Sequence, residues 1–430
     1  MKFTDSLSRF KTTDDRFGEE VACYANFSSR SHNSEFRIPN LVTSILIVLS
    51  EERSARMRIL MTGGGTAGHV NPALAIAATI QEHHPDAEIA FVASTQPRDK
   101  AVDLVPRAGY PLHTVHIRGL IRPYWKPVNL RLPFLMIKSR REAAALIRKF
   151  KPDLIVGTGG YACWPLCSMG KKMGIPTALH ESNAIPGKAV GQLKNDVDLI
   201  MVNFEDTIRR LDETGKHSPT VRVGNPMMAG FAGVSREEAR RALGLAPEET
   251  YILSFGGSLG AEYVNDAVVK LAATLTDHPK VRLLHAAGKR DYDRISADWD
   301  ATPAGKCNRM TLVDYIYDMP VQMAAADLVI SRAGAMSISE LALTGKATVF
   351  IPSPHVAENH QYKNAMALVE QDAALCVEEH KLADGALTET VLPLLLAPAK
   401  RKSMSERITA FACPDANQRI YESLMGLIKS

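Results

Sequence analysis

One pattern occurs three times along this chain: a short apolar run, a group of glycines, and a stretch with helical periodicity. The three copies are RILMTGGGTAGHVNPALAIA at 58–77, DLIVGTGGYACWPLCSMG at 153–170 and YILSFGGSLGAEYVNDAVVKLAATL at 251–275. A buried strand that turns sharply into a helix is the repeating unit of parallel α/β sheets, and glycine permits the sharp turn. The pattern therefore predicts an α/β chain with two similar doubly wound parallel-sheet domains.

Further apolar runs alternate with amphipathic stretches from Met57 onward, as crossover connections between parallel strands require. The alternation stops at MMAGFAGVS, just after VGNP (223–226), and restarts near Tyr251. A chain of 430 residues has room for two such domains. We expect an extension outside the folded core over 1–56, an N-terminal domain over 57–226, a C-terminal domain over 227–415 and a final helix over 416–430 that packs back on the N-terminal domain.

Composition argues against several classes of function. The 51 Lys and Arg against 47 Asp and Glu give a net charge of +4, which does not indicate a nucleic-acid partner. The six cysteines include no C-x-x-C pair, so neither a zinc knuckle nor a disulfide framework is expected. Cys163 and Cys167 share one helix face and are read as core thiols. The Asp-x-Asp pairs at 196/198, 291/293 and 298/300 follow no apolar strand, so we read them as solvated surface and expect no metal.

The longest candidate for a membrane or signal segment is LVTSILIVLS at 41–50. It is shorter than the roughly 18 to 20 apolar residues that cross a bilayer. The charged EERSARM that follows lacks the small residues of a signal cleavage site. We therefore expect neither a transmembrane helix nor a signal peptide.

The first glycine group raises the question of which phosphate it holds. Gly63, Gly65 and Gly68 fit the G-x-G-x-x-G spacing of dinucleotide-binding turns. Such a site also needs an acidic residue at the end of the second strand. That strand is EIAFVASTQ, and its one acid, Glu88, stands at its start. An NAD-dependent oxidoreductase is therefore disfavoured, although a glycine turn before a helix still suits an anion.

The most informative stretch is ISRAGAMSISELALTGKATVFIPSPHVAENHQYKNAMAL at 330–368. It places a turn at Gly334 after a strand, small and hydroxyl residues at a helix start, and Glu340 one turn inside that helix. A helix N-terminus binds a diphosphate, and a carboxylate one turn inside can accept hydrogen bonds from both hydroxyls of a ribose. This combination predicts a nucleoside diphosphate site.

Six motifs resemble, in the same order, those of the MurG family, bacterial glycosyltransferases of family 28. They are GGGTAGHVNPALA, GTGGYACWP, HESNAIPGKA, VGNP, SFGGSLGA, and SRAGAMSISELALTGKATVFIP with ENHQYKNA. The resemblance covers about 57–425. It implies a GT-B fold, two Rossmann-like domains facing a cleft, and no cofactor. It also implies inverting transfer of N-acetylglucosamine from UDP-GlcNAc to the 4-hydroxyl of undecaprenyl-diphosphate-linked N-acetylmuramyl-pentapeptide in peptidoglycan synthesis.

The resemblance assigns the acceptor and the membrane to the N-terminal domain, and the UDP-sugar to the C-terminal domain. The implied donor-binding residues are Thr66, Ala67, Gly68, Asn183, Ser258, Ile316, Ala335, Met336, Ser337, Ile338, Ser339, Glu340 and Gln361. The implied acceptor-binding residues are Gly63, Gly64, Gly65, Gly159, Gly160 and Tyr161. This chain departs from the family pattern at two positions. Many relatives have glycine where this chain has Ala67, and a basic residue where it has Met228.

His69 is the leading candidate for the catalytic base, which an inverting displacement requires. The positive end of the helix after the first glycine loop would lower its pKa and keep the imidazole neutral. The alternative is that His69 only caps the loop or binds an acceptor phosphate. Two other classes of protein stay open: another UDP-sugar enzyme of this fold, such as a UDP-GlcNAc 2-epimerase, and a sugar-nucleotide-binding protein without catalysis.

The segment IRGLIRPYWKPVNLRLPFLMIKSRR at 117–141 mixes bulky apolar residues with cations. One reading is an interface with anionic lipid. The other is that the part from Pro133 onward is a core helix with a basic outer face. The lipid-linked acceptor favours a peripheral enzyme on the cytoplasmic face of the bacterial plasma membrane, with cell-wall synthesis proteins as further candidate partners.

Overall fold

The computed structural model describes residues 56–97, 99–119, 125, 127–227, 230–231, 233–257, 260–356 and 359–429. Within the chain, Met57–Ser430 forms one compact unit. Ser258, Met228 and 120–124, which the sequence singled out, lie outside the described residues. So does the expected extension, apart from Arg56.

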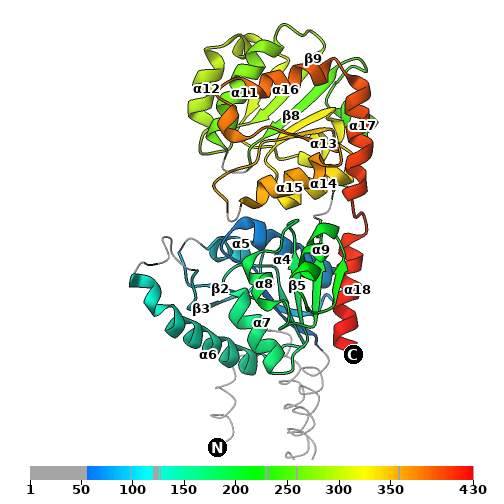
Figure 1. Ribbon diagram of the computed structural model, residues 1–430. Coiled ribbons are helices and arrows are strands. Elements are labelled where there is room, and N and C mark those ends of the chain that lie inside the picture. Colours follow the sequence, from blue (N-terminus) through cyan, green and yellow to red (C-terminus); the bar gives the residue numbers. More distant parts are fainter. Residues whose placement is uncertain are drawn as a thin grey trace, which may run out of the picture. The chain divides into compact units, whose positions relative to one another are not determined.

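The first sheet contains seven parallel strands in the order β3-β2-β1-β4-β5-β6-β7. Its strands are β1 (Arg58–Thr62), β2 (Glu88–Ser94), β3 (Leu112–Val115), β4 (Leu154–Gly157), β5 (Thr177–Glu181), β6 (Leu199–Val202) and β7 (Thr220–Arg222). Its crossover helices are α4 (Ala67–His83), α5 (Ala101–Arg107), α6 (Leu132–Phe150), α7 (Cys163–Lys172), α8 (Lys188–Leu193) and α9 (Glu205–Glu213), with a 3-10 turn, η1 (Pro127–Arg131), before α6 (Figure 1).

The second sheet contains six parallel strands in the order β10-β9-β8-β11-β12-β13. Its strands are β8 (Thr250–Phe255), β9 (Val281–Ala286), β10 (Met310–Val313), β11 (Leu328–Ser331), β12 (Thr348–Phe350) and β13 (Leu375–Cys376). Its helices are α10 (Arg236–Ala242), α11 (Glu262–Leu275), α12 (Tyr292–Asp300), α13 (Met319–Ala325), α14 (Ala335–Leu343), α15 (His360–Val369), α16 (Ala386–Leu395) and α17 (Pro398–Ile408). Short 3-10 turns are η2 (Pro303–Lys306), η4 (Glu379–Lys381) and η5 (Thr409–Phe411). The prediction of two doubly wound parallel sheets is confirmed.

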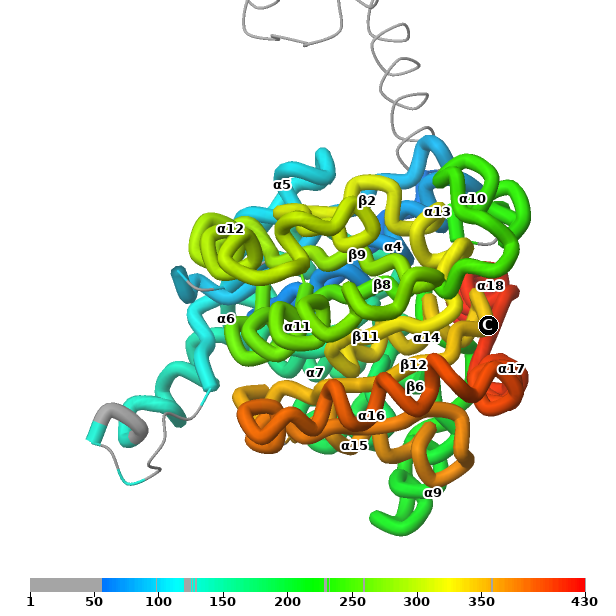
Figure 2. The backbone as a smooth tube through the Cα atoms, turned by 90° about the horizontal axis from the view of Figure 1, so that it is seen from above, coloured from blue at the N-terminus to red at the C-terminus, as the bar shows by residue number. Residues whose placement is uncertain are grey.

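Helices cover both faces of each sheet. Successive side chains of a strand point to opposite faces, so both sets are buried. In β1, Ile59 and Met61 pack with α4 and α5, whereas Leu60 packs with α6 and α7. In β8, Ile252 packs with α11 and α16, and Leu253 packs with α13 and α14. Helices α11 and α16 are in contact and cover the same face of the sheet (Figure 2). The apolar runs of the sequence are therefore core strands, as expected.

The strand order reverses direction at β1 and β4 in the first sheet, and at β8 and β11 in the second. Ligands of open α/β sheets bind at the carboxyl ends of strands beside such a switch point. The loops there are 63–66 after β1, 158–162 after β4, 256–261 after β8 and 332–334 after β11. All three glycine-rich turns and the turn at Gly334 thus occupy the positions where this fold binds ligands.

The last helix, α18 (Ala416–Lys429), belongs to the core of the first sheet. Ile420, Leu424 and Met425 are buried in the cluster that contains Ile59 and Met61. Tyr421 adds a hydrogen bond between its hydroxyl and Nε2 of His84, at 2.9 Å. The chain therefore returns to the first sheet after completing the second, and Figure 1 shows α18 in red beside the first sheet's elements.

The chain passes between the two sheets twice, once after β7 and once before α18, and these two connecting segments contact each other. The amide N–H of Met227 donates to the Asn417 side chain at 2.8 Å, and that side chain donates back to the Met227 carbonyl at 2.9 Å. Nearby, the thiol of Cys413 donates to the Val223 carbonyl at 3.1 Å. The outgoing and returning connections are thus held together by reciprocal bonds.

Candidate active site

The two glycine loops of the first sheet interlock. The N–H of Thr158 donates to the Thr62 carbonyl at 2.8 Å, and the N–H of Gly64 donates to the Gly159 carbonyl at 3.3 Å. A Cβ at Gly160, whose φ is +87°, would lie 2.3 Å from the Gly64 carbonyl oxygen. Glycine is therefore required for both the backbone conformation and the close approach.

His69 lies in the first turn of α4, and the second glycine loop orients its ring. Its Nδ1 is 3.1 Å from the Thr158 carbonyl oxygen. Because a carbonyl only accepts hydrogen bonds, Nδ1 carries the proton and Nε2 keeps a free lone pair in the neutral ring. Burial lowers the pKa of His69 below its usual value, which outweighs the opposing effects of the Thr158 carbonyl and the Asp99 charge. The pKa is lowered, as predicted, but the cause is burial and not the predicted positive end of the helix.

Asp99 is a functional candidate that sequence reasoning missed. Its carboxylate is buried and accepts the N–H of Gly65 at 2.7 Å. The N–H groups of Gly64 and Gly65 are therefore both used within the protein. The only local signal was an acidic residue shortly after β2, five positions beyond Ser94.

Four helices begin at the switch points, and none has a side-chain cap among the described residues: α4, α7, α11 and α14. The first N–H groups of a helix have no partner within the helix, and the helix dipole is positive at that end. Thr66, Ala67 and Gly68, at the start of α4, are exposed. Uncapped helix starts of this kind favour binding of anionic groups such as a diphosphate.

Glu340 lies one turn into α14, as predicted, and has no hydrogen-bond or ion-pair partner among the described side chains. Burial raises the pKa of its carboxyl group to about 7. Glu340 is half-buried, so its carboxyl group is only partly hydrated and can gain hydrogen bonds from donors that a ligand supplies. Glu340 is therefore suited to bind hydroxyl groups of a ligand.

The other predicted residues of α14 divide into two sets. Met336 and Ser337 are half-buried, as Glu340 is, whereas Ala335 and Ile338 are buried. The Ser339 hydroxyl donates to the Ala335 carbonyl at 3.2 Å and accepts from the side chain of Asn225 at 3.0 Å. The Ser339 side chain thus joins α14 to the VGNP segment and is not available to a ligand.

Asn183 also contacts the second sheet's helices. Its side chain is held by Glu181 at 3.0 Å, and its Oδ1 accepts from Asn364 of α15 at 3.2 Å. Asn364 in turn accepts the N–H of Ala184 at 3.0 Å. Asn364 was not predicted, although it stands in the quoted ENHQYKNA motif, one helical turn after Gln361.

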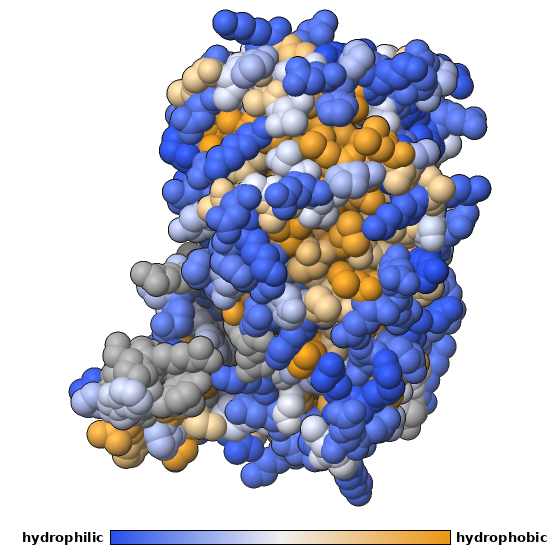
Figure 3. Space-filling model, turned by 45° about the horizontal axis from the view of Figure 1, so that its top comes forward, coloured by the Kyte–Doolittle hydropathy of each residue, from blue (hydrophilic) through white to orange (hydrophobic). Residues whose placement is uncertain are grey.

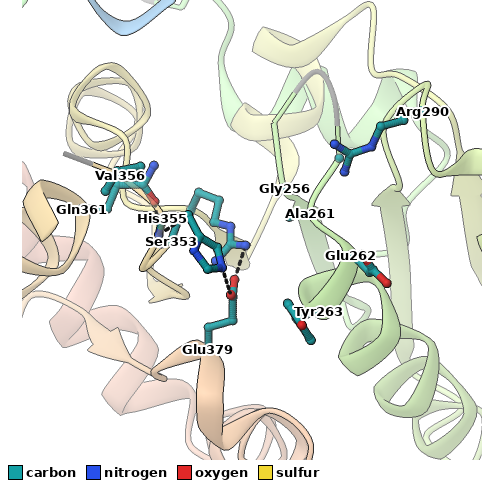
Figure 4. A pocket seen from close by; sticks show the side chains of 12 residues that line it. Gly256, Ala261, Glu262, Tyr263, Arg290, Ser353, His355, Val356, Gln361 and Glu379 are labelled. Carbon is teal, nitrogen blue, oxygen red and sulfur yellow. Dashed lines mark hydrogen bonds and ion pairs between the residues drawn. The ribbon is translucent and has the colours of Figure 1, made fainter. Parts of the chain in front are cut away.

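A cavity of about 440 Å³ lies at the carboxyl edge of the second sheet. Gln361 lines it, and its side-chain oxygen accepts the N–H of Ser353 at 2.9 Å. Arg290 lines the other side, where both oxygens of Asp291 hold its guanidinium, and Figure 4 shows that group directed toward the loop at Gly256 and Ala261. The described residues that line it are Gly256, Gly260, Ala261, Glu262, Tyr263, Arg290, Arg332, Ser353, His355, Val356, Gln361 and Glu379.

The titratable residues Arg332, His355 and Glu379 in this cavity were not predicted. Arg332 donates to the Ile351 carbonyl at 3.0 Å and pairs with the buried Glu379. Ile316 and Glu340 are absent from the lining, and the buried Ile316 contributes to the core beneath the sheet. The predicted donor residues therefore surround the carboxyl edge without all facing one cavity.

The start of α6 contradicts the prediction that the segment from Pro133 onward is a core helix. Ala143 and Ile147 are buried, as a core helix requires, but Phe134 is 75% and Ile137 54% exposed. Trp125, before the helix, is 84% exposed. The core-helix reading is therefore wrong for the first turns, which present apolar side chains to solvent. Figure 3 shows hydrophobic surface at the lower left, the side on which Figure 1 draws the start of α6.

Comparison with known proteins identifies the family. The models of the glycosyltransferase family 28 N-terminal and C-terminal domains match residues 59–197 and 251–420. An enzyme of Acetivibrio thermocellus named UDP-N-acetylglucosamine–N-acetylmuramyl-(pentapeptide) pyrophosphoryl-undecaprenol N-acetylglucosamine transferase is 36% identical over 374 residues, 87% of this chain and 99% of the relative. The enzyme of the same name from Moorella thermoacetica is 35% identical over 87% of this chain and 100% of its own. This chain belongs to the MurG family.

Solved structures agree with the fold of the MurG family. The crystal structure of Acinetobacter baumannii MurG has a TM-score of 0.69 at 24% identity and covers 86% of this chain and 99% of its own. A UDP-GlcNAc 2-epimerase from Neisseria meningitidis bound to UDP-GlcNAc has a TM-score of 0.56 at 14% identity, covering 86% and 100%. The GT-B fold is confirmed, and the epimerase alternative corresponds to a more distant neighbour.

The described residues offer neither a membrane-spanning helix nor a cluster of metal ligands. None of the described helices combines the length and apolar character needed to cross a bilayer. In the same part of the chain, no group of three or more His, Cys, Asp and Glu side chains is arranged to hold a metal ion. Cys163 and Cys167 are buried, as expected, with their sulfur atoms 3.8 Å apart.

Proposed function

We propose that this chain transfers N-acetylglucosamine from UDP-GlcNAc to the 4-hydroxyl of N-acetylmuramyl-pentapeptide linked to undecaprenyl diphosphate. Membership of the MurG family supports both substrates. The structural observation that carries the donor half is Glu340, a half-buried carboxylate with no partner among the described residues, one turn inside a helix without a side-chain cap. There it accepts the two ribose hydroxyls, while the helix start faces the diphosphate.

The reaction is a single displacement with inversion. The acceptor hydroxyl loses its proton to Nε2 of His69 as its oxygen attacks the anomeric carbon. The bond from that carbon to the diphosphate oxygen breaks, and UDP leaves with the electron pair. Three features support His69 in this role: the Thr158 carbonyl on Nδ1, the lowered pKa, and its place at the first switch point.

The remaining predicted contacts are part of the same proposal. The exposed Thr66, Ala67 and Gly68 line the transferred sugar, and Gln361 contacts its hydroxyls. The backbone of Ile316 meets the uracil, the loop containing Ser258 meets the donor diphosphate, and the interlocked glycine loops with Tyr161 face the acceptor diphosphate.

The enzyme binds the cytoplasmic face of the plasma membrane through the start of α6. Exposed Trp125, Phe134 and Ile137 supply apolar contacts, and exposed Arg131 and Lys138 supply positive charge. Each cation near an anionic surface contributes about 1 kcal/mol. Cell-wall synthesis proteins are further partners that this location favours.

Transfer of radiolabelled sugar tests the function directly. The full chain is incubated with labelled UDP-GlcNAc and the lipid-linked muramyl-pentapeptide, and label in the lipid product is measured. Labelled lipid-linked disaccharide is the expected result. Free sugar or an epimerised nucleotide sugar in place of lipid product would contradict the proposal, and a binding protein would give no product at all.

A further inference from the structure

The buried carboxylate of Asp99 joins three separate segments of the first domain. Oδ1 accepts the N–H of Gly65 at 2.7 Å and of Ala101 at 3.1 Å, and Oδ2 accepts the N–H of Ser94 at 3.1 Å. These donors belong to the first glycine loop, the start of α5 and the end of β2. Hydrogen bonds to a charged acceptor are the stronger kind, so this group fixes the loop firmly.

The glycine loop is seated closely on this carboxylate. A Cβ at Gly64 would lie 2.7 Å from Oδ2 of Asp99. Gly65 reaches Oδ1 with φ at +85°, a conformation that favours glycine. Four residues later the chain presents His69, whose ring contacts the second glycine loop: a Cβ at Gly159 would lie 2.5 Å from Nδ1. Asp99 therefore holds the first glycine loop, the segment that leads directly into His69.

We propose that Asp99 is a positioning residue for glycosyl transfer, which holds the first glycine loop and, through it, the His69 imidazole where the acceptor hydroxyl is deprotonated. The inference rests on the role proposed for His69. Removal of the carboxylate releases the loop, and displacement of a catalytic group by about 1 Å costs on the order of a hundredfold in rate.

Asp99 also acts on His69 through its charge. Its negative charge raises the pKa of His69, as does the Thr158 carbonyl, against the lowering by burial. The titratable group on the second glycine loop is Tyr161, whose ring lies over Gly119. Loss of the Asp99 charge therefore moves the His69 pKa further down, a change that a merely structural role would not produce.

The test uses the full chain with Asp99→Asn and a matched control, Asp153→Asn. Asp153 accepts the N–H of Arg58 at 2.8 Å, at the opposite end of β1. The pKa of His69 is measured by NMR titration, with its signal assigned from His69→Gln. Turnover, the KM for UDP-GlcNAc and the melting temperature are measured on the same samples.

Asp99→Asn is expected to lower the His69 pKa and to lower kcat about tenfold to a hundredfold, with the KM for UDP-GlcNAc within twofold. Asp153→Asn should leave all three values unchanged. Gly64→Ala, whose added methyl group would displace the loop from the carboxylate, should also reduce kcat. This variant replaces Asp99→Asn in the test if Asp99→Asn does not fold.

A wild-type kcat or a wild-type His69 titration in folded Asp99→Asn would overturn the inference. Full turnover by His69→Ala would instead overturn the proposed base. The two failures are distinguishable, because the His69 titration in Asp99→Asn does not depend on which group is the base.

Discussion

The Glu340 carboxyl group is poised to change charge near neutral pH, because burial raises its pKa to about 7. The ionised form accepts a hydrogen bond at each oxygen, and these bonds are stronger than those of the neutral acid. The affinity for UDP-GlcNAc, measured by calorimetry, should therefore rise as the pH increases from 6 to 8 and then level off. Glu340→Gln should bind roughly 5- to 150-fold more weakly, from the loss of about 1 to 3 kcal/mol, and should not show this rise.

The control for this prediction is Glu389→Gln, which changes an exposed carboxylate on α16. It should keep the wild-type affinity and its pH dependence. Equal affinity of wild type and Glu340→Gln at pH 8 would remove Glu340 from the donor site.

The same carboxyl group destabilises the folded enzyme above its unfolded pKa. Because its folded pKa is raised to about 7, folding favours the protonated form, and stability is lost as the pH rises from about 4.5 to 7. Glu340→Gln should therefore melt at a higher temperature than wild type at pH 8, with the gap closing near pH 5. Calorimetric melting at the two pH values measures this, and a lower melting temperature at pH 8 would contradict it.

His69 should affect turnover much more than donor binding. General base catalysis is typically worth about 10²- to 10⁴-fold, so His69→Ala should lower kcat by that factor with UDP-GlcNAc affinity within twofold. His69→Gln can still donate to the Thr158 carbonyl and should lose as much activity without loss of melting temperature. If only the KM for the acceptor rises, His69 is a binding residue and the base lies elsewhere.

The residues that sequence reasoning found and missed differ in the range of their contacts. Glu340 and His69 could be predicted because a glycine turn and a helix start are local signals, and their roles stay predictions. Asp99 was missed because its partner Gly65 is 34 residues away. Ser339 was assigned to the donor from its motif, yet its hydroxyl bonds Asn225, a contact across 114 residues that only the folded chain reveals.

At the level of elements, strands with an apolar run were predictable, and the two-residue strand β13 was not. β1, β4 and β8 were each anticipated with the glycine loop that follows. β13 (Leu375–Cys376) was missed because two residues at a sheet edge carry no periodicity. The first turns of α6 were also ambiguous, since Phe134 and Ile137 are as apolar as core residues and only the fold leaves them exposed.

Helix α6 should determine binding to anionic membranes. Phe134→Ser combined with Ile137→Ser removes two exposed apolar side chains, each worth about 1.5 to 3 kcal/mol when buried in an apolar phase. Flotation with vesicles containing anionic lipid should show at least tenfold weaker binding for this variant. Transfer to a detergent-solubilised acceptor should be retained.

The control is Leu396→Ser, since Leu396 is 78% exposed beyond α16 in the second domain. This change should leave vesicle flotation unchanged. Equal loss of vesicle binding in both variants would mean that α6 is not a specific membrane contact.

At the level of the whole molecule, residues 57–430 contain all four described core clusters. A chain that begins at Met57 should therefore melt within about 1 °C of the full chain and show the same kcat. The contrasting deletion removes 416–430 and with it Ile420, Leu424 and Met425, each worth about 2 to 5 kcal/mol in a core. It should melt many degrees lower. A drop of several degrees on removal of 1–56 would show that the extension packs on the enzyme.

The return of α18 to the first sheet affects the order in which the protein is made. A ribosome releases Ile420 and Leu424 only after the entire second domain has been translated, although they complete the core around Ile59. The first half of the nascent chain must therefore wait, with part of its apolar surface uncovered, while the second half is able to fold. Domains usually fold in the order of their synthesis; in this enzyme the first domain is finished last.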